Sequence, residues 1–316
     1  MAARNILVTG ATGKQGGAVI RALTEKPLPF EANILALTRN PDSKSAKKLA
    51  QHPSGNIQLI KGNLDDGDAI FANIGQPVWA VFLVTDAQFG KKAPDGTDLE
   101  VHHGAGMIKA ADANRVSHIV FSSVDRGGDD RSFDNPTKIS HFITKHEIEH
   151  NLLRTVRDAQ HDMTYTILRP TAFMENLNPN TFGTLFAAMW ADMGAKKLQL
   201  VSTRDIGEFA RLSLQHIDAD DDDSPHFRNK AIGLAGDELT QAEANEVFWK
   251  VYGRPMPQAW WLSGKLLQTL VKEVGVMFQW FRDEGYGADI QGVVRRHHPG
   301  TLDFEAYLRQ ESAFVR

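Results

Sequence analysis

Short apolar runs of strand length alternate with longer amphipathic segments through the first half of the chain. Ile6-Leu7-Val8 and Val81-Phe82-Leu83-Val84 are apolar at every position, which is typical of strands covered by helices on both faces of a parallel sheet. The pattern predicts strands at residues 5–9, 33–38, 57–60, 79–84, 118–122 and 164–168, and helices at residues 15–26, 43–52, 66–74, 99–114 and 139–159. We therefore expect an α/β protein with a doubly wound parallel sheet.

The regular alternation weakens after Arg169-Pro170. We expect one domain over residues 1–170 and a smaller C-terminal α/β domain over residues 171–316, with some C-terminal segments returning to the first domain. The acidic run at residues 220–223 precedes Ser224-Pro225 and is interpreted as a solvated loop. The aromatic residues of the C-terminal part favour core or domain packing, and a lining for an apolar ligand stays open; they are Trp249, Tyr252, Trp260, Trp261, Phe278, Trp280 and Phe281.

A glycine-rich segment follows the first predicted strand and opens the first predicted helix. It reads Thr9-Gly10-Ala11-Thr12-Gly13-Lys14-Gln15-Gly16-Gly17. Glycines at this place allow a sharp turn, close approach of a pyrophosphate and tight helix–sheet packing, and the helix start supplies N–H groups and a positive dipole end. The segment indicates a dinucleotide site of the Rossmann type, and a plain Gly-rich turn is the alternative. The candidate binding residues are Gly10, Thr12, Gly13, Lys14, Gln15 and Gly16.

The end of the second strand indicates which dinucleotide is bound. Proteins that bind NAD usually place an acidic residue there, on the ribose hydroxyls. Residues 32–41 contain no acid, and Arg39 follows Ala36-Leu37-Thr38. A guanidinium at this position can pair with the adenosine 2′-phosphate. The sequence therefore predicts NADP(H) over NAD(H), unless Arg39 is only a solvated residue at a strand end.

Several segments, in the same order along the chain, resemble the NmrA-like family of atypical short-chain dehydrogenases, and within it the HSCARG-type branch. They are residues 8–17, 36–41, 61–66, 119–125, 141–145, 166–176, 205–207, 283–290 and 298–299. The resemblance implies a Rossmann domain that binds NADP(H) and a smaller C-terminal domain that closes a cleft over the nicotinamide. It also implies cofactor contacts for Asn63, Leu64, Thr85, Lys145 and Phe173. Relatives often carry Asp where this chain has Asn63. This difference affects the contact expected with adenine.

The resemblance also raises the question of catalysis. Short-chain dehydrogenases place a Tyr four residues before a Lys on one helix, and this chain has His141 in the place of that Tyr, ahead of Lys145. Ser122 and Ser123 end the fifth predicted strand. A neutral imidazole is a weak proton donor, so carbonyl reduction by the tyrosine mechanism is disfavoured. Lys145 can hold the nicotinamide ribose, and a reductase route through Lys145, His141 and Ser123 stays open.

Composition narrows the functional classes. The formal net charge is −4, which disfavours direct binding to nucleic acid. The chain contains no cysteine, so any redox sensing must act through a bound ligand. No apolar run approaches the length of a membrane span, and no targeting segment is recognised, so we expect a cytoplasmic protein, with nuclear entry left open.

Two functional hypotheses follow. The first is a dinucleotide-dependent redox sensor or regulator, a monomer or homodimer, that contacts a regulatory protein partner. The second is an NADPH-dependent oxidoreductase acting through Lys145 on a small apolar carbonyl, quinone or conjugated metabolite. Neither hypothesis includes a metal ion.

Overall fold

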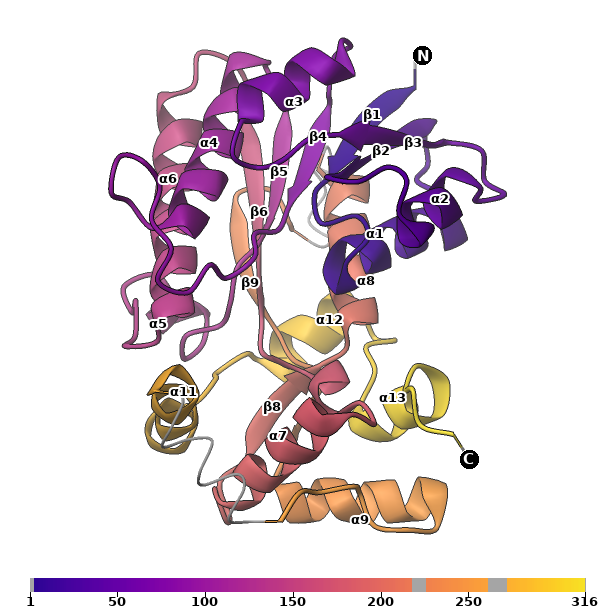
Figure 1. Ribbon diagram of the computed structural model, residues 1–316, viewed down its shortest axis with the longest axis vertical. Coiled ribbons are helices and arrows are strands. Elements are labelled where there is room, and N and C mark those ends of the chain that lie inside the picture. The colour runs from indigo at the N-terminus through magenta and orange to yellow at the C-terminus, as the bar shows by residue number, and fades with distance from the viewer. Residues whose placement is uncertain (1–2, 218–225, 261–271, 316) are drawn as a thin grey trace. The chain divides into compact units, whose positions relative to one another are not determined.

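The computed structural model describes residues 3–217, 226–260 and 272–315 (Figure 1). The acidic run at residues 220–223 and Trp261 lie outside the described residues. Along the chain the elements are β1 Arg4–Val8, α1 Lys14–Glu25, β2 Ala32–Thr38, α2 Lys44–Ala50, β3 Ile57–Lys61, α3 Gly67–Ile74, β4 Ala80–Leu83, α4 Leu99–Ala113, β5 His118–Ser122, α5 Asp129–Ser132, α6 Ser140–Asp158, β6 Thr164–Pro170, β7 Ala172–Phe173, η1 Met174–Leu177, α7 Thr181–Ala191, β8 Leu198–Val201, α8 Thr203–Gln215, β9 Lys230–Leu234, β10 Asp237–Leu239, α9 Gln241–Tyr252, α11 Lys272–Asp283, η2 Ile290–Val294, α12 Arg295–His297 and α13 Phe304–Gln310.

The larger sheet has seven strands in the order β3-β2-β1-β4-β5-β6-β9. The neighbouring pairs from β3 to β6 are parallel, with Leu7 of β1 opposite Leu35 of β2 and Val81 of β4. The strand order reverses between β1 and β4, which makes the carboxyl ends of these two strands the switch point of the sheet. The predicted doubly wound α/β fold is confirmed.

Helices cover both faces of this sheet, which explains why its central strands are apolar throughout. On one face α3, α4 and α6 lie side by side (Figure 1), and Phe71, Met107 and Leu152 from these helices share a buried cluster with strand residues. On the other face α1 and α8 meet so closely that a Cβ on Gly207 would lie 2.4 Å from the carbonyl oxygen of Ala18. Burial from both sides matches the four apolar residues of β4, Ala80–Leu83.

The chain divides into two compact units. The first comprises Met1–Ser123, Thr144–Leu168 and Ile206–Ala231, and the second comprises Val124–Ile143, Arg169–Asp205 and Ile232–Arg316. Each unit thus contains chain from both sides of position 170, and the domain limit expected there stays a prediction.

The second unit contains a three-stranded sheet in the order β10-β8-β7 and an aromatic core. Phe278, Trp280 and Phe281 are buried in this core. Trp249 and Trp260 are instead 55% and 66% exposed, so the aromatic residues of this part do not share one role. Across the described ranges, helices long and apolar enough to span a bilayer do not occur.

Candidate functional site

The first unit contains a cavity of about 360 Å³ at the carboxyl ends of strands β1 to β4. This place is the switch point of the sheet, where open α/β sheets bind their ligands. The cavity is lined by Gly10, Thr12, Gly13, Leu37, Thr38, Arg39, Asn40, Ser43, Ser45, Gly62, Asn63, Leu64, Val84, Asp86, Gln88 and His103. The lining includes six of the predicted cofactor residues, namely Gly10, Thr12, Gly13, Arg39, Asn63 and Leu64.

The glycines that open α1 each have a steric reason for lacking a side chain. Gly10 has a φ of +58°, and a Cβ there would lie 2.7 Å from Val84 Cγ1. A Cβ on Gly16 would lie 2.4 Å from the carbonyl oxygen of Gly10, so helix and loop are in backbone contact. Gly13 is the N-cap of α1 and also lines the cavity. Because glycine has no side chain to cap the helix, the N–H groups of the first turn receive no side-chain acceptor from that residue.

A second cluster of polar groups lies where β2 ends. Arg39 is exposed and lines the cavity together with Asn40, Ser43 and Ser45. The Ser43 hydroxyl accepts a hydrogen bond from Ala46 N at 3.2 Å and caps α2. Arg39 was predicted from the sequence and the two serines were not, although two hydroxyls within six residues of a candidate phosphate ligand were a usable signal.

The third side of the cavity is formed after β3 and by α4. The amide nitrogen of Asn63 donates a hydrogen bond to the carboxylate of Asp65. His103 Nε2 lies 2.6 Å from the other oxygen of that carboxylate. These contacts fix the orientation of the Asn63 side chain at the cavity wall, and His103 is a lining residue that the sequence analysis did not select.

Lys145 is held in a dense polar network in the first unit. Its ammonium donates to Thr85 O at 2.8 Å and to Thr85 Oγ1 at 2.7 Å, and it lies 2.9 Å from Glu100 Oε1. Thr144 donates to the second oxygen of Glu100 at 2.5 Å. An ammonium has three N–H donors, and three acceptors are therefore in place around it. Thr85 lies between Val84 and Asp86, which both line the cavity.

The two charged groups of this network are largely shielded from water. The side chain of Lys145 is 12% exposed and that of Glu100 is 2% exposed. Burial alone would raise the pKa of Glu100, but the Lys145 ammonium and the hydroxyls around the carboxyl outweigh burial and leave this pKa below its ordinary value. Glu100 is therefore a carboxylate at neutral pH. Nothing in the sequence pointed to Glu100 as the partner of Lys145.

The other predicted residues occupy several places. Gln15 accepts a hydrogen bond of 2.5 Å from Ser122 at the end of β5. The Ser123 hydroxyl donates to Glu149. His141 and Phe173 belong to the second unit, where the His141 ring packs edge-on to Phe142 with centroids 4.8 Å apart. The roles expected for His141 and Phe173 at the nicotinamide stay predictions.

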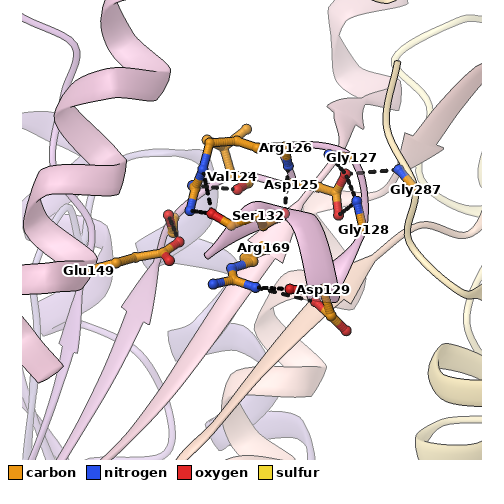
Figure 2. Close-up of polar contacts among 11 residues, drawn as sticks. Val124, Asp125, Arg126, Gly127, Gly128, Asp129, Ser132, Glu149, Arg169 and Gly287 are labelled. Carbon is orange, nitrogen blue, oxygen red and sulfur yellow. Dashed lines mark hydrogen bonds and ion pairs between the residues drawn. The ribbon is translucent and has the colours of Figure 1, made fainter. Parts of the chain in front are cut away.

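The loop after β5 begins the second unit and is organised around one carboxylate (Figure 2). Asp125 accepts hydrogen bonds from the backbone N–H groups of Gly127 at 3.0 Å, Gly128 at 3.1 Å and Gly287 at 2.9 Å. Arg126 is 0% exposed and donates to two backbone carbonyls of the same region. This carboxylate therefore joins two segments of the second unit that lie far apart in the sequence.

Comparison with known proteins identifies two relatives with named activities. An NAD(P)H azoreductase of Xenophilus azovorans is 26% identical over 259 residues, which are 79% of this chain and 75% of that protein. An NmrA-like oxidoreductase, FrzB, of a Cladobotryum species is 32% identical over 118 residues. That alignment covers 37% of this chain and only 33% of the relative.

Solved structures agree with the fold. A Citrobacter triphenylmethane reductase in complex with NADP(H) has a TM-score of 0.70 at 16% identity, covering 98% of this chain and 99% of that one. NmrA, a negative transcriptional regulator solved in complex with NADP, has a TM-score of 0.66 at 16% identity, covering 99% and 96%. A family model described as the NmrA-like family matches residues 2–308. The chain therefore belongs to the NmrA-like family.

Proposed function

We propose that this protein binds NADP(H) in the cavity of the first unit and acts as a dinucleotide-dependent regulator. The loop suits a dinucleotide because Gly10 turns the chain with a φ of +58° and because Gly16 packs directly against the backbone of Gly10, which leaves this stretch of main chain without side chains. The first turn of α1 supplies N–H groups for a pyrophosphate. The same dinucleotide is present in the structures of the Citrobacter reductase and of NmrA.

Arg39 carries the preference for the phosphorylated form. It lies on the cavity wall at the end of β2, with the Ser43 and Ser45 hydroxyls on the same wall. A guanidinium and two hydroxyls match a phosphate dianion, whereas an unphosphorylated ribose prefers a carboxylate. The lining near Arg39 offers no carboxylate; the one acidic lining residue, Asp86, follows β4.

Isothermal titration of the wild-type chain and Arg39→Ala with NADP and NAD tests this assignment. A charge-assisted contact of about 1.5–3 kcal/mol predicts a 10- to 150-fold loss of NADP affinity. Affinity for NAD should stay within about threefold, and Arg154→Ala, which removes an exposed arginine of α6, should bind as the wild type does. An unchanged ratio of NADP to NAD affinity in Arg39→Ala rejects the proposed role.

The arrangement around Lys145 favours regulation over catalysis. The position four residues before Lys145 carries His141 and not the tyrosine that reduction by short-chain dehydrogenases uses. The Lys145 ammonium already contacts Thr85 and the Glu100 carboxylate. Lys145 can therefore hold a ribose by exchanging one hydroxyl partner for another. Proton transfer from it would leave the buried carboxylate without its cation.

Regulation requires two conformations of the protein that bind the cofactor with different affinities. Binding of the cofactor, or its change from the oxidised to the reduced form, then shifts the population of the two conformations. We infer a cytoplasmic protein that presents a different surface to a protein partner in each state. Limited proteolysis and small-angle scattering with NADPH, NADP and no nucleotide test this. Indistinguishable cleavage patterns and scattering profiles in all three, at saturating nucleotide, rule the regulator out.

A reductase is the second candidate, and the likeness to an NAD(P)H azoreductase over three-quarters of that enzyme favours it. Loss of NADPH absorbance over a panel of azo dyes, quinones and enones measures the activity. Turnover that disappears in Lys145→Ala while NADPH still binds would establish the reductase. Absence of turnover across the panel in a chain that binds NADPH supports the regulator.

A further inference from the structure

Two histidines lie one turn apart on α6 and face each other. His146 Nε2 and His150 Nε2 are 3.0 Å apart, and their ring centroids are 4.4 Å apart with 63° between the ring planes. Residues at positions i and i+4 project from the same face of a helix. Both rings are half-buried and belong to the first unit, so the geometry of the pair depends on one helix only.

We propose that His146 and His150 form a binding site for a divalent transition-metal ion of the Ni²⁺, Cu²⁺ or Zn²⁺ class. Imidazole nitrogen is a preferred ligand of all three ions. A neutral ring with its proton on Nδ1 presents the Nε2 lone pair, and two such rings can bind one ion. Binding the ion would move the proton of the Nε2···Nε2 hydrogen bond to Nδ1 of its own ring, so that both Nε2 lone pairs are available to the ion.

The separation of the two nitrogens agrees with a shared ion. Metal–nitrogen bonds to imidazole are about 2.0–2.1 Å long. Two such bonds at a right angle place the nitrogens about 2.9 Å apart, and at a tetrahedral angle about 3.3–3.4 Å apart. The observed 3.0 Å matches the right angle of square-planar or octahedral coordination, which Cu²⁺ and Ni²⁺ adopt. Zn²⁺ requires the rings to open by a few tenths of an ångström.

The pattern His146-Glu147-x-x-His150 also matches the H-E-x-x-H sequence of zinc peptidases, in which the Glu is a general base. Within the described residues, however, no third His, Cys, Asp or Glu joins the pair to complete a metal-holding group. Glu147 lies on the exposed side of the helix. The described residues therefore supply two ligands, and water or a small exogenous ligand would complete the coordination, which favours a binding site over peptidase chemistry.

Titration of the untagged full-length chain with NiCl₂, followed by calorimetry, tests the site. We expect one equivalent of Ni²⁺ to bind the wild type, and His146→Asn and His150→Asn each to bind at least tenfold more weakly. His102→Asn removes a half-buried histidine of the same unit and should bind as the wild type does. Wild-type chain that takes up no Ni²⁺, or single variants that bind as tightly as it does, would overturn the proposal.

A spectroscopic measurement separates ligation from loss of fold. The paramagnetic resonance spectrum of the wild-type chain with one equivalent of CuCl₂ should show two coordinated imidazole nitrogens. Each single variant should show one, and circular dichroism should report unchanged helix content. A wild-type spectrum in which coordinated imidazole is missing contradicts the site even if Ni²⁺ binds elsewhere on the chain.

Discussion

The ion pair between Glu100 and Lys145 should behave as one unit in a double-mutant cycle. Lys145→Met leaves a carboxylate that is 2% exposed with only hydroxyl donors. Breaking a buried pair in this way costs about 3–5 kcal/mol, and the two remaining threonine donors place the expected value near the lower end. Glu100→Gln is milder, at about 1.5–3 kcal/mol, because the ammonium keeps both oxygens of Thr85.

The double variant Glu100→Gln/Lys145→Met contains no buried charge at this place. Its loss of stability should therefore be smaller than the sum of the single losses by about 1.5–3 kcal/mol. Urea unfolding followed by tryptophan fluorescence, at constant m-value, measures all four corners of the cycle. Additivity within about 0.5 kcal/mol would refute the idea that the two charges compensate each other.

The stability difference between the wild type and Glu100→Gln should depend on pH. Because the pKa of Glu100 is lowered in the folded state, its charged form stabilises the fold above the ordinary value of 4.5. That contribution declines as the pH falls through the lowered folded value. The gap in unfolding free energy between the wild type and Glu100→Gln should therefore be constant from pH 6 to 8 and shrink in acid. A gap that widens in acid would show that the fold raises the pKa of Glu100 instead of lowering it.

Three further predictions follow from single positions. Gly16→Ala should abolish NADP binding because its Cβ would lie 2.4 Å from the carbonyl oxygen of Gly10, whereas Gly17→Ala meets its nearest atom at 3.6 Å and should bind within about threefold of the wild type by calorimetry. Burial, with a smaller contribution from the charge of a nearby arginine, lowers the pKa of His118 to about 3, so the unfolded state gains a proton first as the pH falls from 6.5. The unfolding free energy should therefore drop by about 2 kcal/mol between pH 7.5 and 5, and His118→Gln should lack this drop in denaturation curves. Asp125→Ala should lower stability by about 3 kcal/mol or more, because three backbone N–H groups lose their acceptor, and Asp125→Asn should recover part of the loss in a thermal melt.

Much of the fold could be predicted because the strands of the first unit are buried on both faces. The strand expected at residues 118–122 matches β5 at both ends, and the helix expected at residues 139–159 differs from α6 by one residue at each end. β9 was missed. Its sequence Lys-Ala-Ile-Gly-Leu is short and is interrupted by a glycine, so the pattern alone does not distinguish it from a loop.

The candidate site could be predicted where one segment contains both the signal and the chemistry. Gly10, Gly13 and Arg39 could be predicted because each follows a strand in the sequence. Asp86, Gln88 and the pair partner Glu100 could not be selected in the same way. Asp86 and Gln88 gain their place only when the segment after β4 is brought to the cavity, and Glu100 only when α4 is brought beside α6. No spacing along the chain encodes these contacts.

The partnership of Lys145 also limits how the two functional hypotheses can differ. A ribose hydroxyl can replace Thr85 Oγ1 as an acceptor without changing any charge, so holding a cofactor keeps the Glu100 ion pair intact. General acid or base catalysis by the same ammonium must interrupt that pair in each turnover, in surroundings that leave Glu100 2% exposed. A substrate that is reduced at this site would therefore have to take its proton from another donor, such as water. Lys145→Arg preserves the positive charge but not the proton chemistry of the ammonium. If the protein is a reductase, this variant should keep its activity. A Lys145→Arg variant that still binds NADPH but has lost all activity would contradict this reasoning.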